Sequence, residues 1–177
     1  MEIKMVLFLP RDVLSVPISR QVLDNCLETL GVTPDTRADI ALALSEACAN
    51  VVQHAGPGEE YEVLVSARDH RCAIEVVNTA SRDGSSGLDG RFDSVQASRR
   101  SGEAQSDLLA LDDDPVSDLA EHGRGLKIID AVTDNLRFID DQRQGPTVHF
   151  EKTLEWLPDA PGQHLFTVHG VRPAGRS

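Results

Sequence analysis

The spacing of apolar residues divides the first third of the chain into a strand and two helices. A short apolar run at 4–9 predicts an edge strand that ends at Pro10. Apolar residues then recur at helical spacing over 17–30. A second helix is predicted over 35–54, because Thr33 supplies a capping hydroxyl and the proline that follows it suits a first helical turn.

Strand-like runs dominate the remainder of the ordered pattern. The runs at 61–67 and 72–78 predict an antiparallel hairpin. A third helix is predicted to open at Gly123, and the runs at 135–139 and 146–154 predict two further strands. This order predicts an α/β two-layer sandwich, in which a mixed, mostly antiparallel sheet carries its helices on one face.

Composition separates a core domain from two unusual segments. With 177 residues and 40% hydrophobic content, the chain is expected to form one domain, here placed at 1–154. The stretch 79–122 is Ser- and Asp-rich, and its net charge of −6 is half of the formal −12 of the chain. Long polar loops of this kind are typically functional lids or disordered. Residues 155–177 are predicted to be a Pro- and Gly-rich tail with a β-like patch at 165–168 and no assigned role.

The charge balance and the cysteines restrict the function classes. A net charge of −12 argues against a nucleic-acid partner, because phosphate contacts need clustered Lys and Arg. Cys26, Cys48 and Cys72 are far apart and are interpreted as core residues of a reducing compartment. No apolar run approaches the roughly 20 residues of a membrane helix, and no signal-peptide pattern is present. A soluble, cytoplasmic protein that acts through other proteins is expected.

Glu46 and Asn50 are the first candidates for chemistry. They lie four residues apart on the second predicted helix, and therefore project from one face about 6 Å apart along the axis. One interpretation is a solvated polar stripe. In the other, Asn50 supplies an oxygen ligand to Mg²⁺ and Glu46 orients a hydroxyl or water for attack on a phosphoryl group. His54 extends the same row and is interpreted as a helix-end residue.

The segment Gly123-Arg124-Gly125 is the second candidate. Glycines at a helix start let the backbone approach a phosphate, whose charge the free N–H groups and the helix dipole attract. Arg124 can add a positive partner for that phosphate. The alternative is a tight entry into a helix with a surface arginine, and His122 beside it is given no chemical role.

Two longer motifs place these candidates in a family. The helix LALSEACANVVQHA at 42–55 is similar to the N-box of the histidine-kinase-like ATPase superfamily, and HGRGLKIIDAVTD at 122–134 resembles the glycine box that ends its ATP lid. Over 4–154 the chain resembles the anti-sigma-factor serine/threonine kinases of the RsbW and SpoIIAB type within that superfamily, whose fold is the Bergerat or histidine-kinase-like ATPase fold. The resemblance implies that Glu46 is the general base and that Asn50 holds Mg²⁺.

The same resemblance implies the partners. Such proteins dimerise, sequester a sigma factor, and use ATP to phosphorylate a Ser or Thr of a small antagonist with the STAS fold. Neither nucleic acid nor a membrane belongs to this set. The phosphorylation controls which partner is held.

The chain departs from the family pattern after its third predicted strand. The family has Asp-x-Gly-x-Gly there, whereas this chain has Asn78 followed by 79–82 without a glycine. The carbonyl oxygen of Asn78 can still accept a hydrogen bond from an adenine amino group, although a neutral acceptor gives up part of the roughly 1.5–3 kcal/mol of a charge-assisted bond. Three hypotheses follow: a working anti-sigma kinase, a protein-binding regulator of the same fold that does not turn over ATP, and a metabolic or DNA-manipulating ATPase. The small size and the lack of a transducer domain count against the third.

Overall fold

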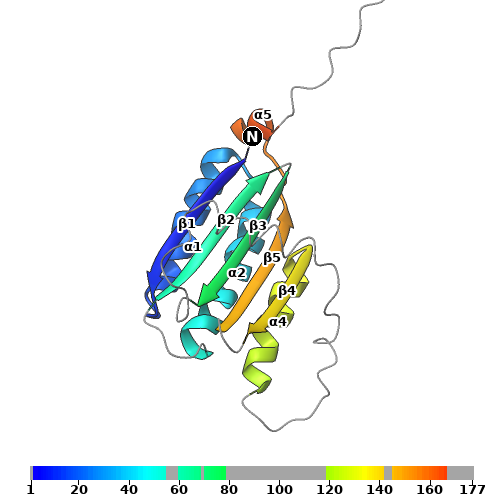
Figure 1. The fold of residues 1–177 in the computed structure, drawn as a ribbon. Helices are drawn as coiled ribbons and strands as arrows, with labels where there is room; N and C mark the ends of the chain where they lie inside the picture. Colours follow the sequence, from blue (N-terminus) through cyan, green and yellow to red (C-terminus); the bar gives the residue numbers. More distant parts are fainter. Residues whose placement is uncertain (1, 55–59, 69, 79–118, 142–144, 167–177) are drawn as a thin grey trace, which may run out of the picture.

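A computed structural model describes residues 2–54, 60–68, 70–78, 119–141 and 145–166 of the chain. Figure 1 shows the order of its elements along the sequence. They are β1 (Ile3–Pro10), α1 (Ser15–Leu30), α2 (Pro34–His54), β2 (Glu60–Arg68), β3 (Arg71–Asn78), α4 (Leu119–Val132), β4 (Asn135–Asp141), β5 (Gly145–Thr153) and α5 (Pro161–Phe166). The predicted strands and helices are therefore present in the predicted order.

The strands form one five-stranded sheet in the order β1-β2-β3-β5-β4. Every pairing among these strands is antiparallel, where a mixed sheet was predicted. β3 and β4 do run in the same direction, but β5 lies between them and runs against both, so the two never form a parallel pair. The predicted edge strand β1 lies at one edge of the sheet.

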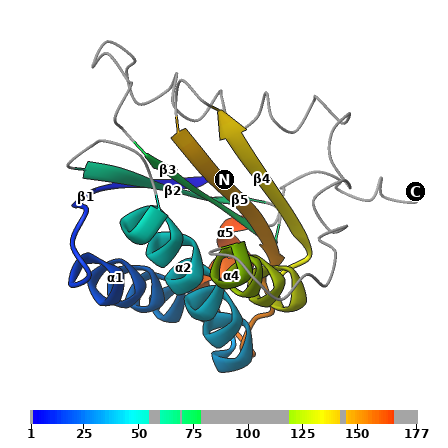
Figure 2. The ribbon, with the colours of Figure 1, turned by 90° about the horizontal axis from the view of Figure 1, so that it is seen from below.

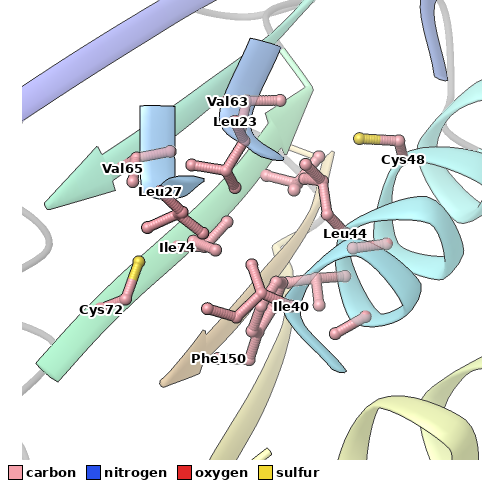
Figure 3. Close-up of a cluster of buried hydrophobic side chains, with 14 of the residues drawn as sticks. Leu23, Leu27, Ile40, Leu44, Cys48, Val63, Val65, Cys72, Ile74 and Phe150 are labelled. Atoms are coloured by element: carbon pink, nitrogen blue, oxygen red, sulfur yellow. The ribbon is translucent and has the colours of Figure 1, made fainter. Parts of the chain in front are cut away.

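The helices α1, α2 and α4 cover one face of the sheet, which confirms the predicted two-layer α/β architecture (Figure 2). Alternate residues of the inner strands point into this layer, and Figure 3 shows their side chains meeting those of α1 and α2. Apolar side chains recur at every second residue of a strand and about every 3.6 residues of a helix, so each element turns one apolar face toward the shared core. Its labelled members are Leu23, Leu27, Ile40, Leu44, Cys48, Val63, Val65, Cys72, Ile74 and Phe150.

The apolar stripe of α1 is wider than the face that the core buries. Leu23 and Leu27 are 2% exposed, whereas Ile18 is 55% exposed and Val22 38%. The helix ends at Gly31, whose φ of 80° is a left-handed conformation that suits a residue without a side chain. α2 then begins where Thr33 was predicted to cap it, and the carbonyl of Thr33 accepts from the N–H of Arg37.

α4 begins at Leu119, four residues before the predicted start at Gly123. Leu119, Ala120 and Glu121 are good helix formers, and they extend the helix ahead of the glycines that were taken as its entry. Of the predicted lid at 79–122, residues 79–118 lie outside the described part of the chain, and 119–122 form the first turn of α4.

Part of the predicted tail packs against the domain. Trp156 forms a β-bridge with Val32, and its Nε1 donates to Nδ1 of His70 at 2.7 Å. A side chain at Gly162 would collide with the Trp156 ring, so α5 approaches the ring closely. Residues 165–166 of the predicted β-like patch belong to α5, and 167–168 lie outside the described residues. α5 lies at the end of the sheet where β1 begins (Figure 1).

None of the helices in the described ranges is both long enough and apolar enough to cross a membrane.

Candidate functional site

Glu46, Asn50 and Gly125 meet where α2 packs against α4. A Cβ atom built on Gly125 would lie 3.1 Å from Oε2 of Glu46 and 3.3 Å from both Nδ2 and Oδ1 of Asn50. These separations are tighter than ordinary van der Waals contact, so α4 comes this close to the two polar side chains only because residue 125 has no side chain. The fold therefore brings together three of the predicted site residues from two separate motifs.

The surroundings of Glu46 and Asn50 show why they face this way. Leu44, Ala47 and Val51 on the neighbouring positions of α2 are at most 1% exposed and point into the core. Glu46 and Asn50 are half-buried on the side toward α4, and not on the outer, solvent side of the helix. Glu46 also borders an open groove of about 640 Å³ between α1 and α2.

Gly123 and Arg124 do not lie at the start of a helix, where they were predicted. Because α4 begins at Leu119, both lie beyond the first turn, and the N–H of Gly123 has the carbonyl of Leu119 as its helical acceptor. Gly125 contributes the absence of a side chain, and neither glycine lies at the helix start. Arg124 is exposed, which is compatible with either interpretation of its role. The side chains of His54 and His122 lie outside what the structure describes.

Asn78 is the last residue of β3 and is 2% exposed. Among the described residues its Oδ1 has no hydrogen-bond partner, although the atom is shielded from solvent. A buried acceptor without a donor costs about 1–3 kcal/mol, so this oxygen favours binding a group that donates a hydrogen bond. An adenine amino group is such a donor, which means that the residue fits the nucleotide role predicted for it.

A buried polar network behind this site was missed in the sequence. Tyr61 of β2 is 0% exposed, and its hydroxyl lies 2.8 Å from Oγ of Ser15 in α1. Cys48, two residues from both Glu46 and Asn50, lies 3.7 Å from Oγ of Ser19. The only signal was the pair of serines four residues apart on an apolar helix, and the sequence analysis treated Cys48 as a simple core residue.

Burial keeps the thiol and the phenol of this network protonated. It raises the pKa of Cys48 to about 11, and it also raises the pKa of Tyr61 above its ordinary value of 10.0. Both groups therefore remain neutral hydrogen-bond donors at any physiological pH.

The described residues contain no group of three His, Cys, Asp or Glu side chains close enough to hold a metal ion by themselves. Mg²⁺ does not require such a cage, because it is usually bound by one or two protein oxygens together with waters and substrate phosphates. Asn50 offers one carboxamide oxygen beside α4, and this donor suits a hard cation.

The family comparison covers nearly all of the described fold. The family model of the histidine kinase-like ATPase domain matches residues 9–152, from the end of β1 to the end of β5. This match includes both sequence motifs, with Glu46, Asn50 and Gly125. It also includes Asn78, whose Oδ1 has no hydrogen-bond partner among the described residues.

Curated relatives point in the same direction. A serine-protein kinase RsbW of Bacillus cereus is 27% identical over 140 residues, which is 79% of this chain and 78% of the relative. Proteins of the same name from Bacillus thuringiensis and Bacillus anthracis are each 28% identical, with the same coverage. The predicted resemblance to RsbW-type kinases is thereby confirmed. Since the family model spans most of its length, the chain belongs to the histidine kinase-like ATPase domain family.

Proposed function

We propose that this protein is an anti-sigma regulator that binds Mg-ATP between α2, α4 and β3 and phosphorylates a Ser or Thr of a STAS-type antagonist. The observation that carries the proposal is the close approach of Gly125 to Glu46 and Asn50, at 3.1 and 3.3 Å from a Cβ position. It places a carboxylate and a magnesium-type oxygen donor together against the glycine of the second motif.

The residues divide the work by their chemistry. Oδ1 of Asn50 is the protein ligand of Mg²⁺, which, when bound with ATP, neutralises charge on the phosphates. Oε2 of Glu46 accepts the proton of the incoming Ser or Thr hydroxyl, and the open groove beside it admits a side chain from a partner protein. Gly125 lets α4 lie in contact with both side chains.

The adenine end of the site rests on Asn78. Its buried, unpartnered Oδ1 accepts a hydrogen bond from the adenine amino group. Because the carboxamide is neutral, this bond is weaker than the one that a carboxylate makes, and modest nucleotide affinity is expected.

The relatives support the proposed partners. The curated RsbW proteins match about four fifths of this chain, and each is named a serine-protein kinase. By the resemblance to RsbW-type kinases, we propose that the chain forms a homodimer and sequesters a sigma factor, and that phosphorylation of the antagonist controls which partner is held.

Phosphotransfer to a cognate STAS protein tests the catalytic part. With γ-labelled ATP and Mg²⁺, label is expected on a Ser or Thr of the antagonist, and Glu46→Gln is expected to remove it while leaving the circular-dichroism spectrum unchanged. Label transfer of equal rate by the Glu46→Gln variant would contradict the role of the carboxylate.

A second candidate is a regulator of the same fold that binds its protein partners without turning over ATP. The missing glycines at 79–82 and the neutral Asn78 favour it. The two candidates separate in one experiment: sigma-factor capture that is indifferent to ATP, together with no labelled antagonist, supports the second and excludes the first.

A further inference from the structure

Four polar side chains stand in the apolar core directly behind the site, and they link three elements. Ser15 and Ser19 come from α1, Cys48 from α2 and Tyr61 from β2, and each is at most 2% exposed. Apolar residues of similar size fill such positions at least as stably, because burying polar groups carries a desolvation cost. We therefore interpret these polar groups by how their hydrogen bonds position the three elements, and not as a source of stability.

The hydrogen bonds of this network have a fixed direction. The hydroxyl of Ser15 donates to the carbonyl of Asp12 at 2.6 Å, and that of Ser19 donates to the carbonyl of Val16 at 2.8 Å. Each serine has one proton, so its oxygen remains only as an acceptor toward its other neighbour. Tyr61 must then donate to Ser15 across 2.8 Å, and Cys48 donates to Ser19 across 3.7 Å.

Cys48 and Tyr61 also contact each other, so the two donors form one connected group. This group is attached to the part of α2 that carries the site, here called the site turn and defined as residues 46–50. Successive helix residues are rotated by about 100°, so Cys48 leaves the site turn on nearly the opposite side from Glu46 and Asn50. The turn is held on one side by Gly125 and on the other by the network.

Tyr61 connects this hydrogen-bonded group to Asn78, the proposed adenine-binding residue. In the sheet register Tyr61 is directly opposite Asn78, the residue with the orphan acceptor. A shift of the tyrosine ring relative to α2 therefore changes the distance between Asn78 and the site turn, which carry the two ends of one ligand.

We propose that Tyr61 is a positioning residue of the nucleotide site: its hydroxyl, acting with Ser15 and Cys48, fixes the site turn relative to the end of β3. The role rests on the proposed function, because it concerns the same nucleotide. In this role, a buried hydroxyl that contacts neither end of the nucleotide sets the distance between its phosphate and adenine sites.

Tyr61→Phe is the direct test, since it removes the hydroxyl and keeps the ring. We expect the Kd for Mg-ATP, measured by calorimetry, to rise about tenfold, which is one misplaced hydrogen-bond contact in affinity terms. Thr36→Val is the matched control: Thr36 is 3% exposed and accepts from Thr33 at the opposite end of α2, so its loss removes a buried hydroxyl away from the site. The control is expected to leave the Kd within twofold.

Cys48 supplies a rescue series. Cys48→Ala removes the donor to Ser19, and its Kd is expected to rise severalfold. Cys48→Ser keeps an O–H donor in the same place and is expected to bind close to the unmodified chain. A purely packing role predicts the reverse order, because a buried serine hydroxyl is more costly to desolvate than an alanine methyl group.

Amide hydrogen exchange of the nucleotide-free chain separates this inference from the proposed function. Tyr61→Phe is expected to speed exchange over 44–52 about tenfold more than over the rest of the core, whereas Thr36→Val does not. Uniform exchange changes, with a Kd within twofold, would overturn the positioning role. If the unmodified chain binds no Mg-ATP, the proposed function falls, and the exchange pattern alone supports or overturns the role of Tyr61.

Discussion

Gly125→Ala is the substitution whose consequences the structure defines most sharply. The added methyl carbon would lie 3.1 Å from Oε2 of Glu46 and 3.3 Å from the carboxamide of Asn50, where ordinary contact needs about 3.5–4.0 Å. The two side chains must therefore retreat by a few tenths of an ångström or rotate. Both are ends of flexible side chains and not backbone, so the helix pair α2 and α4 can stay together.

The expected effects on stability and on binding differ in size. Replacing a glycine inside a helix by alanine stabilises by about 1 kcal/mol, and overpacking costs about 1–3 kcal/mol. The free energy of unfolding is therefore expected to fall by no more than about 2 kcal/mol. Nucleotide binding and phosphotransfer suffer more where the side chains rotate, because rotation moves their polar atoms by about 1 Å, and a misplacement of that size costs on the order of 100-fold in rate.

Urea denaturation and Mg-ATP calorimetry on the same preparations measure the two effects. Lys127→Ala is the control, since Lys127 is exposed on the same helix two residues further on. We expect Gly125→Ala to lose no more than about 2 kcal/mol in free energy of unfolding and to bind Mg-ATP at least tenfold more weakly. Unchanged affinity would refute the assignment of this helix contact to the nucleotide site.

Three further predictions concern other parts of the chain. Asn78→Asp is expected to tighten Mg-ATP binding in calorimetry about threefold to tenfold, because a carboxylate is the stronger acceptor, and to lower the melting temperature of the free chain because the charge is buried; weaker binding would exclude Asn78 as the adenine acceptor. Asp134→Asn is expected to cost about 0.5–1 kcal/mol in urea unfolding, since Asp134 accepts two 2.6 Å hydrogen bonds from Thr153. These bonds lower the pKa of Asp134 below 3.8, so its contribution is complete above pH 3.8 and disappears as the pH falls through the lowered value; a difference that persists in stronger acid would contradict this assignment. Trp156→Phe removes the hydrogen bond to His70 and is expected to cost a similar amount of stability while leaving the Kd for Mg-ATP unchanged, because His70 and Asn78 lie at opposite ends of β3.

The predictions that held depend on local patterns. Thr33 and Pro34 mark the start of α2 because a proline ring suits the first helical turn, although the Thr33 hydroxyl bonds to the Thr36 side chain and not to a backbone N–H. The hairpin of β2 and β3 follows from two β-rich runs joined by a short polar turn. Glu46 and Asn50 could be placed on one helix face by spacing alone.

The features that the sequence did not reveal depend on contacts between distant segments. Ile18 and Leu23 are equally apolar, and only the packing of α1 on the sheet decides that the first is exposed and the second buried. The sequence around Gly125 did not indicate that Glu46 and Asn50 would lie against it. Trp156 could not be placed from the sequence, since its partners Val32 and His70 are far from it along the chain. Tyr61 joined the site only once strand register placed it opposite Asn78.

Calorimetric titration of the purified chain with ATP, in the presence and absence of Mg²⁺, tests the proposed function most directly. Asn50→Ala is measured in parallel, because it removes the proposed magnesium donor and leaves the helix with a better helix former. The account predicts saturable binding of one ATP per chain that depends on Mg²⁺ and is lost in the variant. No binding by the unmodified chain at millimolar Mg-ATP, or equal binding by Asn50→Ala, would contradict it.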